Sequence, residues 1–306
     1  MEKVKFFKSG MVSIVGRPNV GKSTLLNTIL GQKVAIVSKV PQTTRHQIRG
    51  IYHDDRGQIV FIDTPGLHRG KDKLDEFMNN ASSATFDSVD CVIYLVDTSR
   101  PIGKEEESIA HQLKDVKEPV ILGLNKVDLK KGSDIAEYIS FWEKVKGRPV
   151  TDMKNFAMIA LSGQEEINVK KLIDIIFDFL PKGPALYPKD QVSDLPQRLV
   201  MSEIIREKFF ELLREELPHS LGVVIEDLQT IKKTLHIKAM ICVERDSHKE
   251  IVIGKKGQML KTVGTSARQD LENLLETKIF LELFVKVQPD WRDDVGLLQE
   301  LGYSFD

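Results

Sequence analysis

Cysteine is scarce in this sequence, with two residues, Cys91 and Cys242, among 306. Both lie in apolar runs far apart in the chain, which favours buried free thiols over a disulfide or a metal site. No apolar run is long enough to span a bilayer, so no transmembrane helix is predicted. The first ten residues lack the apolar core and cleavage site of a signal peptide, and we therefore expect a cytoplasmic protein.

The sequence also lacks an excess of charge of either sign. Its 44 Lys and Arg residues against 45 Asp and Glu residues leave a net charge of −1, so any contact with RNA must be local. The 41% of hydrophobic residues is ordinary for a globular protein. A length of 306 residues favours two domains, each with its own core.

The segment GRPNVGKS at 16–23 carries the strongest motif. It lies between an apolar run at 11–15 and a helix-compatible run at 24–30, which predicts a strand, a glycine-rich turn and a helix. Such a turn directs backbone N–H groups at phosphates, while Lys22 neutralises the β- and γ-phosphates and Ser23 offers its hydroxyl to Mg²⁺. A chance glycine turn is the alternative. The predicted nucleotide contacts are Gly16, Asn19, Val20, Gly21, Lys22, Ser23 and Thr24.

A polar loop at 33–47 follows and contains two threonines. A threonine in such a loop can reach Mg²⁺ only while a γ-phosphate is bound, so hydrolysis would release the loop. We assign this role to Thr44, with Thr43 as the alternative. A merely solvated loop is the other interpretation.

Strands at 48–52 and 58–62 predict a hairpin, and the motif Asp63-Thr64-Pro65-Gly66 ends its second strand. An acid at the end of a buried strand needs a partner, which Asp63 would find in a metal ion bound through water. The Gly66 N–H would bond the γ-phosphate and sense its loss. All four residues of this motif are predicted nucleotide contacts. His68 is interpreted as a solvated loop residue rather than a catalytic one.

Apolar runs at 91–96 and 119–124 predict buried parallel strands, which alternate with helices at 74–86 and 104–114. The second strand leads into Asn125-Lys126-Val127-Asp128. Asp128 can accept hydrogen bonds from N1–H and the exocyclic amine of guanine, a pair of donors that adenine does not offer. Asn125 would hold this loop, and the stem of Lys126 would cover the ring.

A helix at 135–145, a strand at 157–161 and a helix at 169–180 complete the first domain. We predict that the Ala160 N–H meets the guanine oxygen. Isoleucine precedes this alanine where guanine-nucleotide domains usually have serine, and the insertion of Gln164-Glu165-Glu166 lengthens the loop. We therefore expect a lower nucleotide affinity.

These motifs together resemble those of the Era family of GTPases, including the hydrophobic residue, Leu67, that follows Gly66. Ras-like GTPases have at that position a glutamine that orients the attacking water, and leucine cannot do so. The resemblance implies a K⁺ ion bound through Asn19; the alternative is that Asn19 only braces the loop. It also implies binding of small-subunit (16S) ribosomal RNA near its 3′ end, a part in 30S subunit maturation, and some membrane association.

Four prolines between 181 and 196, without any periodic pattern, predict a domain linker. The expected domains are 1–182 and 199–306, joined by the linker 183–198. A long amphipathic helix at 199–217 opens the second domain with one apolar face, made of Leu199, Ile204, Ile205, Phe209, Leu212 and Leu213. The further predicted elements are strands at 221–228, 235–243 and 279–287, a short helical segment, and a helix at 258–275. Their order resembles a type II KH domain.

The motif Gly254-Lys255-Lys256-Gly257 is predicted to join two helices of that domain and, with Ile253, to contact RNA. Glycine lets a nucleic-acid backbone approach, and the lysines meet phosphates. Residues 249–268 hold five basic residues and one acid in a half that is acidic overall, which favours a local single-stranded RNA site. A KH-like fold that contacts protein is the alternative. Groove residues are predicted at Ile251, Val252, Ile253 and Leu260, with packing in the core as the alternative for each, and Trp291 is expected to pack rather than stack on a base.

The sequence thus predicts the α/β class: a P-loop NTPase domain of the GTPase type, with a mostly parallel sheet and helices on both faces, followed by an α+β type II KH domain. We expect a monomer that hydrolyses GTP with Mg²⁺ bound by Ser23, Thr44 and Asp63. Lys22, Thr44, Asp63 and Gly66 are the predicted catalytic residues. The alternatives are a signalling GTPase whose C-terminal domain binds protein or membrane, and an RNA-modification enzyme that uses GTP.

Overall fold

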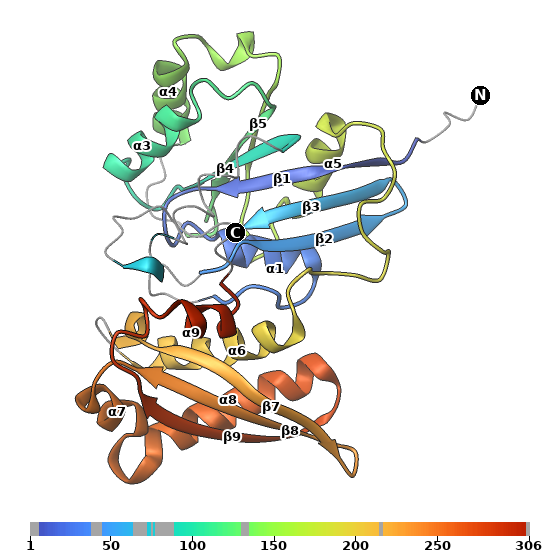
Figure 1. Ribbon diagram of the computed structural model, residues 1–306. Coiled ribbons are helices and arrows are strands. Elements are labelled where there is room, and N and C mark those ends of the chain that lie inside the picture. The colour runs from blue at the N-terminus through green and yellow to red at the C-terminus, as the bar shows by residue number, and fades with distance from the viewer. Residues whose placement is uncertain are drawn as a thin grey trace. The chain divides into compact units, whose positions relative to one another are not determined.

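The computed structural model describes residues 6–37, 45–63, 72–74, 76, 89–129, 135–213 and 217–303, which form two compact units (Figure 1). The first unit takes its residues from 1–35, 44–67 and 80–194, and the second from 36–43, 68–79 and 195–306. The division after Asp194 falls within the predicted linker. Two short stretches of the first half of the sequence belong to the second unit.

A six-stranded sheet in the order β2-β3-β1-β4-β5-β6 forms the centre of the first unit. Its strands are β1 (Lys8–Val15), β2 (Ile48–Asp54), β3 (Gly57–Asp63), β4 (Cys91–Asp97), β5 (Val120–Asn125) and β6 (Phe156–Ala160). All neighbours are parallel except β2 and β3, which form the predicted hairpin. The carboxyl ends of β1, β3, β4, β5 and β6 therefore meet at one edge, where the predicted nucleotide motifs follow.

Helices cover both faces of this sheet, as expected. They are α1 (Lys22–Leu30), α3 (Lys104–Gln112), α4 (Ile135–Lys146) and α5 (Val169–Phe179), with a 3₁₀ turn at Val150–Asp152. Alternate residues of β4, such as Val92 and Tyr94, pack with the fully buried Trp142 of α4 in one core. On the other side, α1 contacts β2, β3 and α5. The helix predicted at 74–86 falls almost entirely on residues that the structure does not describe.

The predicted linker lies along the edge strand β2 instead of spanning free space. The Ile51 N–H donates to the Val192 carbonyl (2.8 Å). The buried side-chain oxygen of Gln58 accepts bonds from the N–H groups of Leu186 (2.7 Å) and Tyr187 (2.9 Å). These bonds satisfy backbone groups that an exposed edge would leave open.

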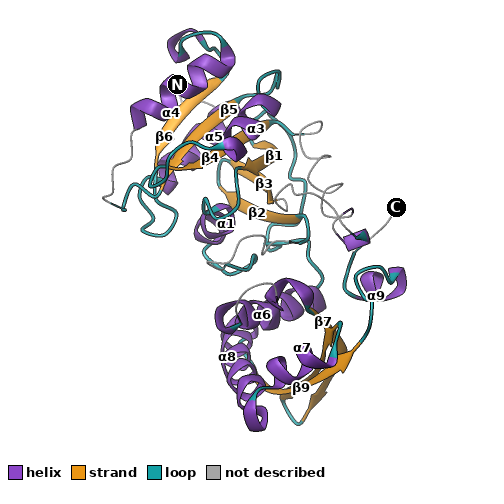
Figure 2. Ribbon diagram, turned by 90° about the vertical axis from the view of Figure 1, so that its left-hand side faces the viewer, coloured by secondary structure: helices purple, strands orange, loops and turns teal. Residues whose placement is uncertain are grey.

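The second unit has a three-stranded sheet in the order β7-β8-β9. Its elements are α6 (Gln197–Leu212), β7 (Gly222–Ile231), β8 (Thr234–Val243), α7 (Asp246–Ile253), α8 (Gln258–Leu275), β9 (Lys278–Val287) and α9 (Val295–Glu300), with 3₁₀ turns at Leu217–Ser220 and Lys255–Gly257. The order predicted for a type II KH domain is confirmed. Figure 2 shows α6 and α8 on one side of the sheet. Helix α9, which was not predicted, packs with Trp291 in a smaller apolar cluster that also contains Val224 and Cys242 of the sheet.

Helix α6 differs from the prediction in length and exposure. It ends at Leu212 rather than 217, and Leu212 itself is 39% exposed although it was assigned to the apolar face. Arg206, Glu207 and Lys208 lie between the residues assigned to the apolar face and are also buried. Their charges are tolerated because they are paired: Arg206 lies 2.6 Å from Glu203, and Lys208 lies 2.7 Å from Asp270 of α8.

Candidate nucleotide-binding and RNA-binding sites

The phosphate-binding loop connects β1 to α1 and needs its two glycines for different contacts. A Cβ atom at Gly16 would lie 2.3 Å from the Leu95 carbonyl oxygen. Gly21 has a φ of 102°, and a Cβ there would lie 2.5 Å from the Asn125 amide nitrogen. The loop is thus pressed against β4 and the end of β5 so closely that only glycine fits.

Lys22, Ser23 and Asp63 converge beside this loop. The Lys22 ammonium donates to the Gly16 carbonyl (2.9 Å), and burial lowers the pKa of Lys22 although the Asp63 carboxylate opposes the shift. The Ser23 hydroxyl donates to Asp63 Oδ2 (2.8 Å). Asp63 is completely buried, burial raises its pKa, and its Oδ1 has no hydrogen-bond partner among the described residues. The open Oδ1 of Asp63 and the nearby Ser23 hydroxyl are oxygen ligands of the kind that Mg²⁺ prefers.

The motif at 125–128 ties the phosphate-binding loop to β5. Asn125 donates to the Val20 carbonyl (2.7 Å) and accepts a bond from the Gly163 N–H (3.1 Å). The Lys126 ammonium donates both to the Asn19 carbonyl and to Asp97 Oδ2, each at 2.7 Å. These bonds hold Asn125 and Lys126 against the phosphate-binding loop.

Asp128 lies at the same edge of the sheet, half-buried, and its Oδ1 has no partner among the described residues. A buried carboxylate oxygen that is left open costs free energy until a donor arrives. This oxygen is available to the N1–H and amine donors of guanine.

Ala160 and the loop that follows it lie at the end of β6. Ala160 is the last residue of β6, and its carbonyl accepts a bond from Asn168 (2.7 Å). Gly163, not Ala160, lies beside Asn125. Ser162, one residue earlier, is buried and its hydroxyl accepts the Glu165 N–H (3.1 Å). The loop beside Asn125 therefore contains a serine, which comes two residues after Ala160.

Several predicted site residues lie outside the described residues: Thr43, Thr44, Thr64, Pro65, Gly66, Leu67 and His68. Val20 and Thr24 are described, the first completely buried and the second half-buried at the start of α1. The described residues contain neither a cluster of three metal-binding His, Cys, Asp or Glu side chains nor a helix that could cross a membrane.

The turn between α7 and α8 contains the second glycine motif. Gly254 has a φ of 72°, and a Cβ there would lie 2.6 Å from the Met259 Cβ. The Gly257 N–H donates to the Gly254 carbonyl (3.0 Å), which closes the turn. Lys255 and Lys256 between them are exposed. The motif therefore presents two cations on a tight turn, as predicted.

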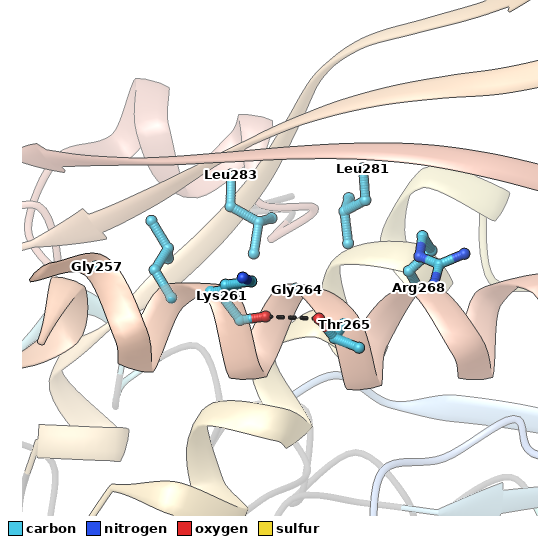
Figure 3. A pocket seen from close by; sticks show the side chains of 8 residues that line it. Gly257, Lys261, Gly264, Thr265, Arg268, Leu281 and Leu283 are labelled. Carbon is cyan, nitrogen blue, oxygen red and sulfur yellow. Dashed lines mark hydrogen bonds between the residues drawn. The ribbon is translucent and has the colours of Figure 1, made fainter.

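A groove of about 320 Å³ runs from this turn along α8 and beneath β9. Figure 3 shows Leu281 and Leu283 directed from β9 toward α8, with Arg268 at the end far from Gly257. A Cβ at Gly264 would lie 3.4 Å from Leu283, so a larger side chain there would fill the groove. The lining residues are Gly257, Leu260, Lys261, Gly264, Thr265, Arg268, Leu281 and Leu283.

Only part of the groove lining was predicted from the sequence. Of its four predicted groove residues Leu260 lines the groove, whereas Val252 is buried in the core and Ile251 is 53% exposed. Helical spacing from 257 through 261, 264, 265 and 268 would have revealed the lining face of α8. Trp291 is packed as predicted, because its side chain is completely buried. Its ring N–H donates to the Ser220 carbonyl (3.1 Å).

Both cysteines are buried free thiols, as predicted. Burial raises the pKa of Cys91 and that of Cys242 to about 12, so neither thiol ionises near neutral pH.

The fold and the two sites define a GTPase of the P-loop type that carries a KH domain. Two family descriptions match the chain: "50S ribosome-binding GTPase" over residues 11–126 and "KH domain" over residues 216–292. The GTPase Era of Halothermothrix orenii (strain H 168) is 44% identical over 299 residues, which cover 97% of this chain and 99% of that protein. The chain therefore belongs to the Era family of GTPases.

Solved structures agree with this assignment. Era in complex with MgGDPNP and nucleotides 1506–1542 of 16S ribosomal RNA has a TM-score of 0.90 and 37% identity, covering 98% of this chain and 100% of that one. A point variant of Aquifex aeolicus Era bound to GDP and aluminium fluoride has a TM-score of 0.89 and 36% identity, with the same coverage.

Proposed function

We propose that this GTPase binds small-subunit (16S) ribosomal RNA near its 3′ end through the KH groove and assists maturation of the 30S subunit. The groove carries the proposal, because its apolar floor lies beside the exposed Lys255 and Lys256 at one end and ends at Arg268, which is paired with Glu272 (3.0 Å), at the other. Unstacked bases suit an apolar groove of this kind, and the flanking cations suit the phosphates. The solved relative in complex with a 16S fragment supports the choice of RNA.

Hydrolysis by this chain rests on positioning and charge. The Lys22 ammonium and the backbone N–H groups of the phosphate-binding loop would hold the β- and γ-phosphates, and no general base is assigned. The buried, unsatisfied Oδ1 of Asp63 and the hydroxyl of Ser23 fit Mg²⁺, with Thr44 as the proposed third residue. When bound, the ion neutralises charge on the phosphates. Gly66 would contact the γ-phosphate.

Guanine selectivity is assigned to Asp128, whose open Oδ1 would accept the ring donors. Because Gly163 rather than Ala160 adjoins Asn125, we assign the contact to the guanine oxygen to the Ser162–Gly163 loop. Asn19 remains a proposed K⁺ ligand. Hydrolysis that is faster in KCl than in NaCl supports that assignment, and equal rates would remove it.

Two described segments favour coupling between nucleotide state and RNA binding. Residues 36–37 lead into the polar loop of Thr44, and residues 72–74 follow the motif at 63–66; both belong to the KH unit. The Val37 N–H donates to Glu207 of α6 (3.2 Å). Asp72 pairs with Arg292 (2.8 Å), and Leu74 is buried in the cluster of Trp291 and α9. Both nucleotide loops therefore continue along the chain into segments that pack within the KH unit, and we propose that this continuity transmits a change in either loop.

We further propose a monomer that resides in the cytoplasm and associates peripherally with the membrane. The decisive experiment is crosslinking in cells followed by sequencing of the attached RNA, with GTP-locked and GDP-bound forms compared. Enrichment of the 3′ end of 16S RNA that depends on the nucleotide supports the proposal. Loss of all RNA at physiological salt would favour a signalling GTPase whose C-terminal domain binds protein or membrane.

A further inference from the structure

Glu106 is a buried acid that the reaction described above does not use. It lies in the first turn of α3, and its side chain is completely buried while its neighbours Glu105 and Glu107 are exposed. Apart from an ion pair with Arg17, its carboxylate oxygens have no partner among the described residues. A buried carboxylate requires a compensating charge.

That charge comes from the phosphate-binding loop. Arg17 Nη1 lies 2.8 Å from Glu106 Oε2, with 11% of the Arg17 side chain exposed. The same nitrogen faces the Pro101 carbonyl (3.5 Å) in the segment before α3. The Arg17 carbonyl accepts a bond from the Lys22 ammonium (3.3 Å), so a chain of polar contacts leads from α3 to the lysine of the phosphate site.

The surroundings of Glu106 favour its neutral form. Burial, with smaller contributions from the negative charges of Glu105 and Asp97, raises the pKa of Glu106 to about 7, although Arg17 and Arg100 oppose the shift. The Tyr94 hydroxyl of β4 donates to the Glu106 backbone carbonyl (3.3 Å), and burial together with the charge of Glu106 raises the pKa of Tyr94 and that of Tyr138 in α4. The Arg17 contact is therefore an ion pair above pH 7 and is weakened below it.

We propose that Glu106 is a positioning residue that holds the phosphate-binding loop in its nucleotide-binding conformation through Arg17. The Arg17–Glu106 pair fixes the loop on the side of α3, and Lys126 fixes it at Asn19 on the side of β5. With both contacts made, less ordering of the loop is required when nucleotide binds. Because coupling is reciprocal, bound nucleotide should also favour the ionised form of Glu106.

The test compares Glu106→Gln, which keeps the shape and removes the charge, with Glu107→Gln as a matched control on the same helical turn. GDP affinity of the full chain is measured from pH 6 to pH 8 with a fluorescent GDP analogue. At pH 8 we expect Glu106→Gln to bind about 3- to 10-fold more weakly than the parent, and the ratio to approach one at pH 6. Titration of the nucleotide phosphates cancels in this ratio. Glu107→Gln should match the parent throughout.

A purely structural ion pair gives a different result. In that case Glu106→Gln would lower the melting temperature of the nucleotide-free protein while the folded protein bound GDP with parental affinity at every pH, and the proposal would be overturned. The double variant Arg17→Gln with Glu106→Gln supplies a second criterion. If Glu106 acts through Arg17, the double variant should lose no more GDP affinity than the weaker-binding single variant. Losses of the two single variants that add up in the double variant would contradict action through Arg17.

Discussion

The nucleotide site and the KH groove of this chain differ in how they present their polar groups. Asn125 and Lys126 are held by hydrogen bonds to the phosphate-binding loop, and Asp63 and Asp128 each keep one buried oxygen open for a ligand. In the KH unit the cations Lys255, Lys256 and Lys261 are exposed around an apolar floor. Buried open acceptors discriminate sharply between ligands, because a ligand without the matching donors leaves them unpaired. An apolar floor with exposed cations selects by shape and charge.

The largest effect is expected from removing the cation at the phosphates. Lys22→Ala should lower kcat by about 10³-fold, or about 4 kcal/mol, because the charge developing on the phosphates loses a preorganised partner. Phosphate release under single-turnover conditions measures this loss. A fall of less than tenfold would contradict the role given to Lys22.

Leu74→Ala should destabilise the KH unit by about 3 kcal/mol, since the side chain is 1% exposed and packs with Trp291 and α9. Leu74 comes from the first half of the sequence, so this variant tests whether that segment is part of the KH core. Unfolding followed by Trp291 fluorescence in a chain with Trp142→Phe reports on the KH unit alone. An unchanged midpoint relative to that background would show that residues 72–74 do not belong to this core.

Replacement of Asp128 by Asn should shift the nucleotide preference from GTP toward xanthosine triphosphate. GTP affinity should fall about 100-fold, or about 2.7 kcal/mol, because an amide presents donors where the guanine ring also has donors. Xanthosine triphosphate carries a carbonyl in place of the exocyclic amine, so its affinity should rise. Competition between the two nucleotides for the same site gives the ratio. If both nucleotides lost affinity equally, the acceptor role would be wrong.

The smallest effect is expected in the groove. Lys255→Asp with Lys256→Asp should weaken binding of single-stranded RNA about tenfold to thirtyfold at 0.15 M salt and flatten its salt dependence. The pair Lys232→Asp with Lys233→Asp is the matched control, since both lysines are exposed in the β7–β8 turn. GTP hydrolysis without RNA should be the same in both double variants. Equal RNA loss in the control pair would indicate a diffuse electrostatic effect rather than the glycine turn.

Much of this architecture follows from local pattern. The hairpin of β2 and β3, the buried strands β4 and β5 and the helix α8 are close to their predicted bounds, because periodicity and turn residues act over short distances. The positions of Asn125, Lys126 and Asp128 also follow, since a parallel strand delivers whatever comes after it to one edge of the sheet. The motif at 254–257 is a turn between helices, as its glycines require.

Other features depend on contacts between distant segments. The burial of Glu207 and Lys208 involves partners far away in the sequence, Val37 and Asp270, and the Ser162–Gly163 loop is recognised only by its bond to Asn125. The sequence by itself determined the GTPase and KH architecture and the motifs of both sites, because strand period, glycine turns and residue chemistry are local properties. Only the tertiary structure decided that Glu106 pairs with Arg17, that Leu74 joins the core of Trp291 and which side of α8 lines the groove, because burial and charge pairing arise when the chain folds upon itself.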